Sequence, residues 1–256
     1  RWCSTLRASG LSRETVYLRR AQVSQLARAM AHGPLDVEVD EILVWLGGRD
    51  WTRETRRTHR SGYRRFFTFL GRVELAEALP RVKPTGPRPR PIPEDLLQAG
   101  LRVADDRTRL MLRLAAEVGL RRGEISRVHA TDLSRGLDGW TILVHGKGDR
   151  ERELPLSDGL AAAIRLRAGG DWLFPGDYLG TGHVSPAWVG KLTSRALPEG
   201  WTLHKLRHRF ATVVHENTHD LVVVQTLLGH ASLATTQLYV AANRERLRAG
   251  ALSAAA

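Results

Sequence analysis

Residues 215–219 spell H-E-x-x-H, the spacing with which zinc hydrolases place two imidazoles and a glutamate base on one helix face. A zinc site needs these residues to continue one helix, so that His215 and His219 point the same way. The Asn-Thr pair between the histidines is poor in the middle of a helix, and Asp220 is suited to cap a second helix. The pattern therefore favours a junction between two helices, and we expect no metal site.

Four other stretches carry residue types suited to a different chemistry. In chain order they read GLRRGEI (119–125), HGKGDRERELPL (145–156), HKLRH (204–208) and LLGHASLATTQLY (227–239). Their order, their spacing and the helical and hairpin patterns around them resemble the tyrosine recombinase family, the phage-integrase type of site-specific DNA recombinase. The resemblance covers the chain after residue 94 at the level of motifs, and the N-terminal segment more loosely.

The resemblance implies roles for residues in all four stretches. The implied catalytic residues are Arg121, Lys147, His204, Arg207, His230 and Tyr239, with Glu124 as the support of Arg121. His230 belongs to an L-G-H motif and would add a hydrogen bond to the phosphate. Relatives also carry a turn resembling E-N-G-x-D. The corresponding residues of this chain are 216–220, with Thr218 in place of the glycine.

The same residue types suit cleavage of a phosphodiester without a metal. Such cleavage needs a nucleophile, cations for the non-bridging oxygens and an acid for the leaving oxygen. Arg121 and Arg207 can bind those oxygens and stay charged at any working pH. Lys147 can protonate the 5′ oxygen, while His204 can bond the phosphate or take the tyrosine proton. Attack by Tyr239 forms a 3′-phosphotyrosine that a second strand's 5′ hydroxyl reverses, so we expect neither ATP nor a metal cofactor.

Each residue taken alone has an ordinary structural interpretation. Arg121 and Glu124 could form a surface ion pair, Lys147 could be a solvated turn residue and Tyr239 could belong to a core. Their joint occurrence favours catalysis, and we expect integration or excision of a phage or mobile element. Xer-type resolution of chromosome or plasmid dimers is the nearest alternative, followed by a type IB topoisomerase-like enzyme and a binding-only relative.

The charge of the chain favours a polyanion as partner. Among 256 residues, 39 Lys and Arg stand against 27 Asp and Glu, a formal net charge of +12. A positive electrostatic field of that size is most often found in proteins that bind nucleic acid. No apolar run approaches the roughly 18 residues of a membrane span. Cys3 is the only cysteine, which excludes an internal disulfide and fits the cytoplasm or nucleoid of a bacterial host.

Arginines follow one face of a helix expected over residues 51–71. An apolar stripe beside them predicts that the helix packs on one side and offers guanidinium groups to DNA phosphates on the other. The arginines lie at i, i+3, i+4, i+7 and i+11 and are Arg53, Arg56, Arg57, Arg60 and Arg64. Further helices are expected over 11–31, with Ser12 as its cap, and around 41–46.

Residues 80–93 hold six of the chain's eleven prolines and four basic residues. Such a stretch cannot be helix or inner strand. It predicts a basic linker over 83–94, in which Lys83 contacts DNA, between a helical core-type DNA-binding domain (1–82) and a catalytic domain (95–256). The fold class expected is mainly α with a small antiparallel β-sheet, namely a helical core-binding domain plus an α+β tyrosine-recombinase catalytic domain with a hairpin over 140–156.

The family resemblance also implies an assembly. Two domains would clamp double-stranded DNA at attachment or core sites, and a homotetramer on synapsed DNA would exchange strands through a Holliday junction. A host DNA-bending factor and a directionality factor are expected as further partners, and a membrane is not. Residues 243–256 could dock on a neighbouring protomer.

Overall fold

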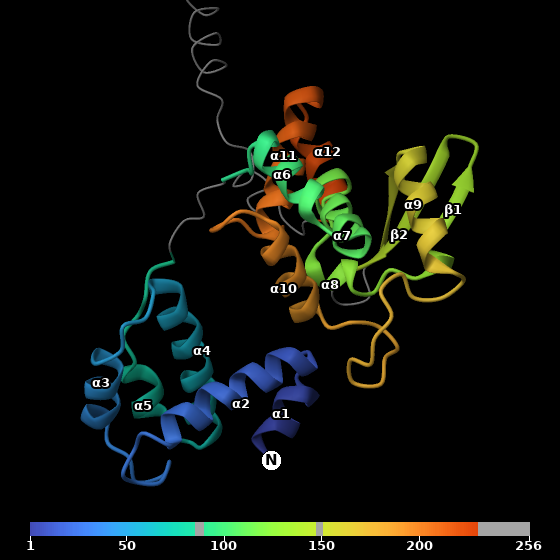
Figure 1. The fold of residues 1–256 in the computed structure, drawn as a ribbon. Coiled ribbons are helices and arrows are strands. Elements are labelled where there is room, and N and C mark those ends of the chain that lie inside the picture. Colours follow the sequence, from blue (N-terminus) through green and yellow to red (C-terminus); the bar gives the residue numbers. More distant parts are fainter. Residues whose placement is uncertain (85–89, 147–150, 230–256) are drawn as a thin grey trace, which may run out of the picture. The chain divides into compact units, whose positions relative to one another are not determined.

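Residues 1–84, 90–146 and 151–229 are described by the computed structural model, in which the chain divides into two units, Arg1–Gly86 and Pro87–Ala256 (Figure 1). Three residues of the expected catalytic set, Lys147, His230 and Tyr239, lie outside the described residues. Among the helices of the described part, none is long and apolar enough to cross a membrane.

The first unit is built from helices. They are α1 (Trp2–Ala8), α2 (Arg13–Ala27), α3 (Val39–Gly47), α4 (Arg53–Phe69) and α5 (Val73–Ala78). Ser12 caps α2 as predicted, because its hydroxyl accepts a hydrogen bond from the Thr15 amide at 3.3 Å. Tyr63 and Phe67 of α4 are fully buried in the same cluster as Ile42 of α3, and α4 packs against both α2 and α5, so α4 is the central helix of this unit's core.

The arginines of α4 divide into two groups. Arg56 is half-buried and donates hydrogen bonds to backbone carbonyls that include Leu46 at the end of α3, at 2.9 Å. Arg60 donates to the carbonyl of Leu79 at 3.1 Å. The exposed arginines of this helix are Arg53, Arg57, Arg64 and Arg65. The predicted basic face is therefore narrower than its spacing indicates, because two of its members hold neighbouring backbone in place.

The second unit surrounds a buried helix. Its elements are α6 (Glu94–Val103), α7 (Asp106–Glu117), α8 (Arg122–Ile125), the 3₁₀ turn η1 (Ala130–Asp132), β1 (Leu133–Gly136), β2 (Gly139–His145), β3 (Glu151–Leu156), α9 (Asp158–Ala168), α10 (Pro186–Ala196), α11 (Leu203–Thr218) and α12 (Leu221–Leu228). Met111, Leu112 and Leu114 of α7 are fully buried, and both α10 and α11 contact this helix. α7 thus provides the support on which the site-bearing elements pack.

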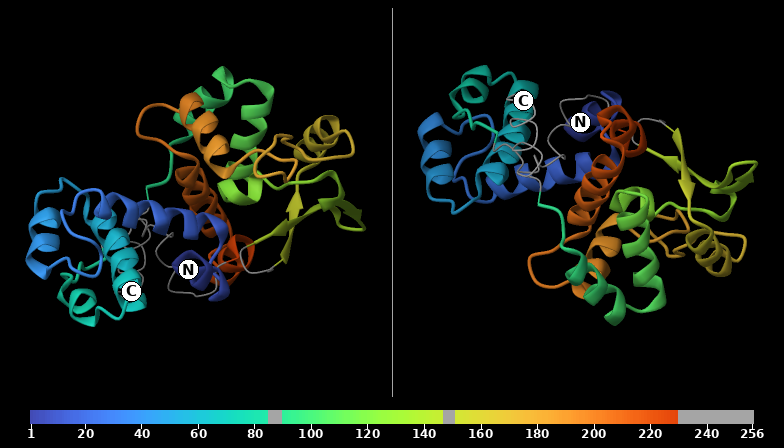
Figure 2. Two further views of the ribbon diagram at one scale, coloured as in Figure 1. Left: turned by 90° about the horizontal axis from the view of Figure 1, so that it is seen from below. Right: turned by 90° about the horizontal axis from the view of Figure 1, so that it is seen from above.

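A three-stranded antiparallel sheet, ordered β1-β2-β3, lies at one side of this unit within the described residues, with α9 beside it (Figures 1 and 2). The hairpin predicted over 140–156 is confirmed, since β2 pairs with β3 in a register that sets His145 opposite Glu151. β1 is an addition that the sequence did not predict, because Leu133–Gly136 shows no apolar alternation. Mainly helical content with one small sheet confirms the expected fold class.

The junction between α11 and α12 differs in detail from the expectation. α11 continues through Asn217 and Thr218, and the left-handed residue that ends it is His219, with φ 56°. Asp220 then caps α12 as predicted, accepting from the Val222 amide at 2.7 Å. The predicted break at the Asn-Thr pair was therefore wrong by about one residue. His219 lies in the turn after α11, outside the helix that carries His215.

Candidate active site

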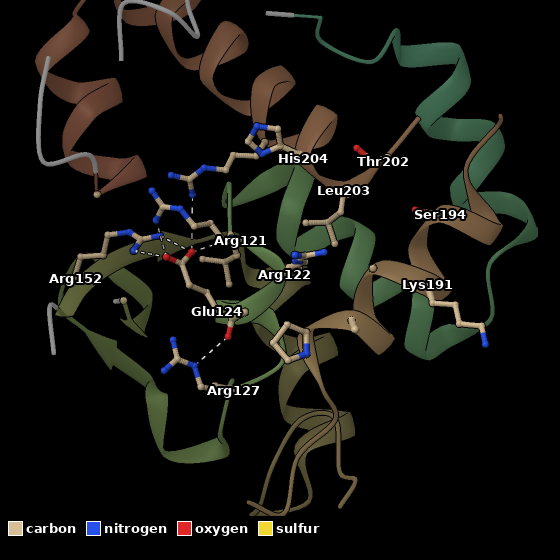
Figure 3. Close-up of a pocket in the computed structure, with 18 of the residues that line it drawn as sticks. Arg121, Arg122, Glu124, Arg127, Arg152, Lys191, Ser194, Thr202, Leu203 and His204 are labelled. Carbon is tan, nitrogen blue, oxygen red and sulfur yellow. Dashed lines mark hydrogen bonds and ion pairs between the residues drawn. The ribbon is translucent and has the colours of Figure 1, made fainter. Parts of the chain in front are cut away.

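A cleft in the second unit gathers cationic side chains from α8, β3, α10 and α11 (Figure 3). The cationic residues that line it are Arg121, Arg122, Arg127, Arg152, Lys191, Arg195 and Arg207. Glu124 and Glu151 are the acidic side chains among the described lining residues. The excess of positive charge suits the cleft to an anionic ligand.

Arg121 and Glu124 are joined by the start of α8. Arg121 is the residue before the helix, and the Glu124 carboxylate reaches back to accept from its amide at 2.8 Å. The Arg121 guanidinium donates to the same carboxylate, Nη1 to Oε1, at 2.8 Å, while its side chain stays 44 % exposed. The spacing of three residues therefore orients Arg121 from behind and leaves its remaining donors to the cleft.

Glu124 is a buried carboxylate, with 3 % of its side chain exposed. Arg152 of β3 pairs with it at two points, Nη1 to Oε1 at 3.0 Å and Nη2 to Oε2 at 2.9 Å. Burial alone would raise the pKa of Glu124, but the hydrogen bonds and charge of Arg152, with the Arg121 amide and charge, lower it to about 2. Glu124 is therefore a permanent anion around which arginines assemble.

Arg207 lies behind this group on α11, with 1 % of its side chain exposed. It donates to the carbonyls of Gly119, just before Arg121, and of Leu228, at the end of α12. Its Nη1 is 3.9 Å from the Glu124 carboxylate. Arg121 and Arg207, which are 86 positions apart in the chain, thus share one anionic support.

His204 is one helical turn before Arg207 and also lines the cleft (Figure 3). Its ring makes an edge contact with the buried His208, with 4.5 Å between centroids. Desolvation lowers the pKa of His204, and the nearby charges of Arg207 and Lys205 lower it further. The lowered pKa favours the neutral ring, which is the form that can accept a proton.

The structure brings together four residues of the expected set. Arg121, Glu124, His204 and Arg207 meet at the cleft as described above. Gly146 and Gly229, the residues before Lys147 and His230, also line it. Arg152 is a site residue that the sequence analysis missed. Its only local signal is a basic residue in the hairpin, whereas its partner Glu124 lies 28 positions away.

The H-E-x-x-H residues form a separate group. His215 belongs to α11 and His219 to the turn after it, and the two ring centroids are 6.4 Å apart. None of the three side chains lines the cleft in the described structure. Over residues 1–84, 90–146 and 151–229, no group of three or more His, Cys, Asp or Glu side chains is placed to hold a metal ion.

Comparison with known sequences gives one consistent result. A sequence model of the phage integrase family matches residues 93–246. The chain is 32% identical to tyrosine recombinase XerD of Caulobacter vibrioides over 254 residues, with 84% of this chain and 81% of the relative covered. It is also 32% identical to tyrosine recombinase XerC of Chromohalobacter salexigens over 250 residues, covering 86% of this chain and 83% of the relative.

Comparison with solved structures agrees. An integrase from mycobacterium phage Brujita is 30% identical, with a TM-score of 0.50 and coverage of 97% of this chain and 88% of that one. A lambda integrase(75-356) dimer bound to a COC′ core site gives a TM-score of 0.75 at 18% identity, covering 95% and 94% of the two chains. The second likeness is one of fold.

Proposed function

The chain belongs to the phage integrase family and is a site-specific tyrosine recombinase, and from this premise we propose that its cleft breaks and rejoins DNA through a 3′-phosphotyrosine. The observation that carries the proposal is the shared support of Arg121 and Arg207. The Arg121 guanidinium contacts the Glu124 carboxylate, the Arg207 guanidinium approaches it, and both arginines line one cleft with His204. Such a group of fixed cations suits the charge that develops on a phosphodiester under attack.

We assign the chemical steps as follows, from this arrangement and from the sequence motifs that carry Lys147, His230 and Tyr239. The Tyr239 oxygen attacks phosphorus and the bond to the 5′ oxygen breaks, with His204 accepting the tyrosine proton and Lys147 protonating the leaving oxygen. Arg121 and Arg207 bind the non-bridging oxygens. His230 adds a hydrogen bond to the phosphate. The 5′ hydroxyl of another strand reverses the step, which conserves the bond and uses no nucleotide.

The proposed ligand is double-stranded DNA at a core site. Relatives of the same fold have been solved with DNA, including the lambda integrase dimer on its core site. We infer that residues 1–82 bind the DNA backbone through the exposed arginines of α4, that 83–94 form a linker with the exposed Lys83, and that 95–256 catalyse. Strand exchange between two sites would use a homotetramer in the bacterial cytoplasm, with a host bending factor and a directionality factor as partners.

Two biological roles follow from the relatives. Integration or excision of a phage or mobile element agrees with the likeness to the Brujita phage integrase. Resolution of dimeric chromosomes or plasmids agrees with the likeness to the XerD and XerC recombinases. Integration joins two different sites, whereas resolution acts on two copies of one site. Recombination assayed on both kinds of plasmid substrate, once a site is known, separates the two roles.

A nicked duplex tests the proposed chemistry. A binding site is first selected by the full chain from a pool of random duplexes, and a nick near the cleavage point then lets the broken strand diffuse away and traps the covalent intermediate. We expect a protein–DNA band with the wild type in the presence of chelator, and none with Tyr239→Phe. A band that survives Tyr239→Phe would show that another residue is the nucleophile, and the absence of any band on bound DNA would contradict the proposed function.

A further inference from the structure

The end of α12 is held by side chains of the cleft. A helix leaves its last carbonyls without partners from its own turn, and these must be satisfied elsewhere when the end is buried. In α12 the Leu227 carbonyl accepts from Arg152 Nε at 3.0 Å, and the Leu228 carbonyl accepts from Arg207 Nη2 at 2.6 Å. Two consecutive carbonyls are thus satisfied by two guanidinium groups, whose charge also complements the negative end of the helix.

Arg152 is the residue that joins the parts of the site. It belongs to β3, its two terminal nitrogens bind Glu124 of α8 and its Nε binds Leu227 of α12. Its side chain is 13 % exposed, so these contacts are largely shielded from water. Removing one partner of such a buried ion pair strongly lowers the stability of the fold, because the other charge remains buried and uncompensated.

Each contact of Arg152 leads to a different part of the proposed chemistry. β3 begins at Glu151, four positions after Lys147 in the sequence. Glu124 orients the Arg121 guanidinium. α12 ends at the residue before Gly229, which is followed by His230 and the segment of Tyr239.

We propose that Arg152 is a positioning residue for DNA cleavage, which couples the phosphate-binding Arg121 to the end of α12, the helix that precedes His230 and Tyr239 in the sequence. This inference rests on the proposed function. Only an arginine satisfies the geometry, because a planar guanidinium can serve two carboxylate oxygens and a carbonyl at once, whereas a lysine ammonium cannot span them.

Gly229 fits the same interpretation. It has φ 64°, and a Cβ at this position would lie 3.0 Å from Arg152 Cδ and 3.1 Å from its Nη1. The chain therefore turns out of α12 directly against the Arg152 side chain. The turn at Gly229 and the Arg152 guanidinium therefore occupy adjoining space.

Arg152→Lys separates positioning from folding. On the nicked duplex selected by the wild-type chain, we expect single-turnover cleavage at saturating DNA to fall about 10- to 100-fold, the range of one or two charge-assisted hydrogen bonds. Affinity for the same uncleaved duplex should stay within about threefold, because bulk phosphate contacts dominate it. Arg102→Lys, an exposed arginine of α6 outside the cleft, is the matched control and should change neither value.

A double-variant cycle and chemical rescue test whether Arg152 affects the cleavage rate through Glu124. If Arg152 acts through Glu124, the rate losses of Arg152→Lys and Glu124→Gln will be less than multiplicative in the double variant. Guanidinium chloride at low millimolar concentration should partly restore cleavage by Arg152→Ala, while sodium chloride at equal ionic strength should not. A defect in folding would respond to neither test.

Hydrogen exchange tests the coupling without DNA. In Arg152→Lys, amides of the last turn of α12 should exchange about tenfold faster than in the wild type, while those of α7 should keep their rates. Unchanged exchange at the end of α12, multiplicative rate losses, or equal losses of binding and cleavage would each overturn the proposal. If the wild type forms no covalent band, the proposed function fails, and hydrogen exchange still decides whether Arg152 holds α12.

Discussion

Arg207 donates a hydrogen bond to the carbonyl of Leu228, the last residue of α12, at 2.6 Å. The same guanidinium donates to the carbonyl of Gly119, two positions before Arg121. The buried Arg207 therefore connects the backbone just before Arg121 to the end of α12. Its positive charge also lies near the Glu124 carboxylate. This dual role predicts that substitutions of Arg207 affect both stability and catalysis.

Arg207→Lys is expected to lower the free energy of unfolding by about 1–3 kcal/mol, because a lysine leaves at least one buried carbonyl without a donor. Cleavage of the nicked duplex should fall about 100- to 1000-fold, the usual cost of losing one donor to a developing oxyanion. Urea unfolding and single-turnover assays measure the two effects. Arg102→Lys serves as the control, and a full-rate Arg207→Lys enzyme would remove Arg207 from the catalytic set.

Glu124 predicts a specific acid sensitivity. Its pKa is lowered from 4.5 to about 2 in the folded protein, so its ionised form contributes stability that is complete above pH 4.5 and is lost as the pH falls towards 2. The contribution is about 3 kcal/mol on this basis. Urea unfolding at a series of pH values should show the difference between wild type and Glu124→Gln shrinking over that window. A constant difference would contradict the ionised state assigned to Glu124.

The left-handed glycines offer a matched pair of variants. Gly169 ends α9 with φ 53°, and apart from its chain neighbours no atom lies within 4 Å of the place that a Cβ would take there, whereas a Cβ at Gly229 would meet Arg152. Gly169→Ala should cost about 1–2 kcal/mol from backbone strain alone. Gly229→Ala should cost about 1–3 kcal/mol more because of overpacking. Thermal and urea unfolding compare the two, and equal costs would show that Arg152 moves aside freely.

His204 should titrate below its usual pKa of 6.5, because desolvation and then the charges of Arg207 and Lys205 disfavour its protonated form. Cleavage by the wild type should therefore keep its rate as the pH falls through 6.5 and decline only at lower pH. Lys205→Gln removes one of these charges and should move the decline to higher pH. Lys191→Gln is the control, since Lys191 lines the cleft but does not contribute to the shift. Cleavage rates of the three proteins, measured at saturating DNA over pH 5–8 (about the range in which histidine titrates), show whether the decline shifts only in Lys205→Gln.

The α4 arginines predict two kinds of variant. Arg53→Gln and Arg64→Gln should weaken DNA binding and reduce the slope of log affinity against log salt by about one each, without loss of stability. Arg56→Gln should lower stability by about 1–3 kcal/mol, because it leaves the Leu46 carbonyl without its donor. Salt titrations of binding, with urea unfolding alongside, distinguish the two groups. A salt slope that is unchanged in both exposed variants would exclude α4 from the DNA interface.

Features set by neighbouring residues were predictable from sequence. Ser12 and Asp220 cap helices because each lies within three residues of the amides it serves. The β2–β3 hairpin follows from alternation around a glycine-containing turn. The pairing of Arg121 with Glu124 is likewise local, since three positions of one helix start bring them together.

Features set by distant residues were not predictable in this way. Helical spacing places Arg56 beside Arg53, but only the fold brings the end of α3 to its guanidinium. Arg152 stands in a strand whose sequence gives no sign that a carboxylate 28 positions earlier and a carbonyl 75 positions later will meet there. The roles of Lys147, His230 and Tyr239 stay predictions of the sequence.

The long sequence separation of these contacts has a consequence for synthesis. The bonds from Arg207 to Gly119 and from Arg152 to Leu227 span 88 and 75 positions, so they close only after α11 and α12 have been made. Contacts of this kind form late, after the local hairpin and helices. A nascent chain on the ribosome would carry a folded hairpin and an exposed Arg152–Glu124 pair well before it could cut DNA. Completion of the described part of the cleft is thus timed by translation, because it waits for the synthesis of α11 and α12.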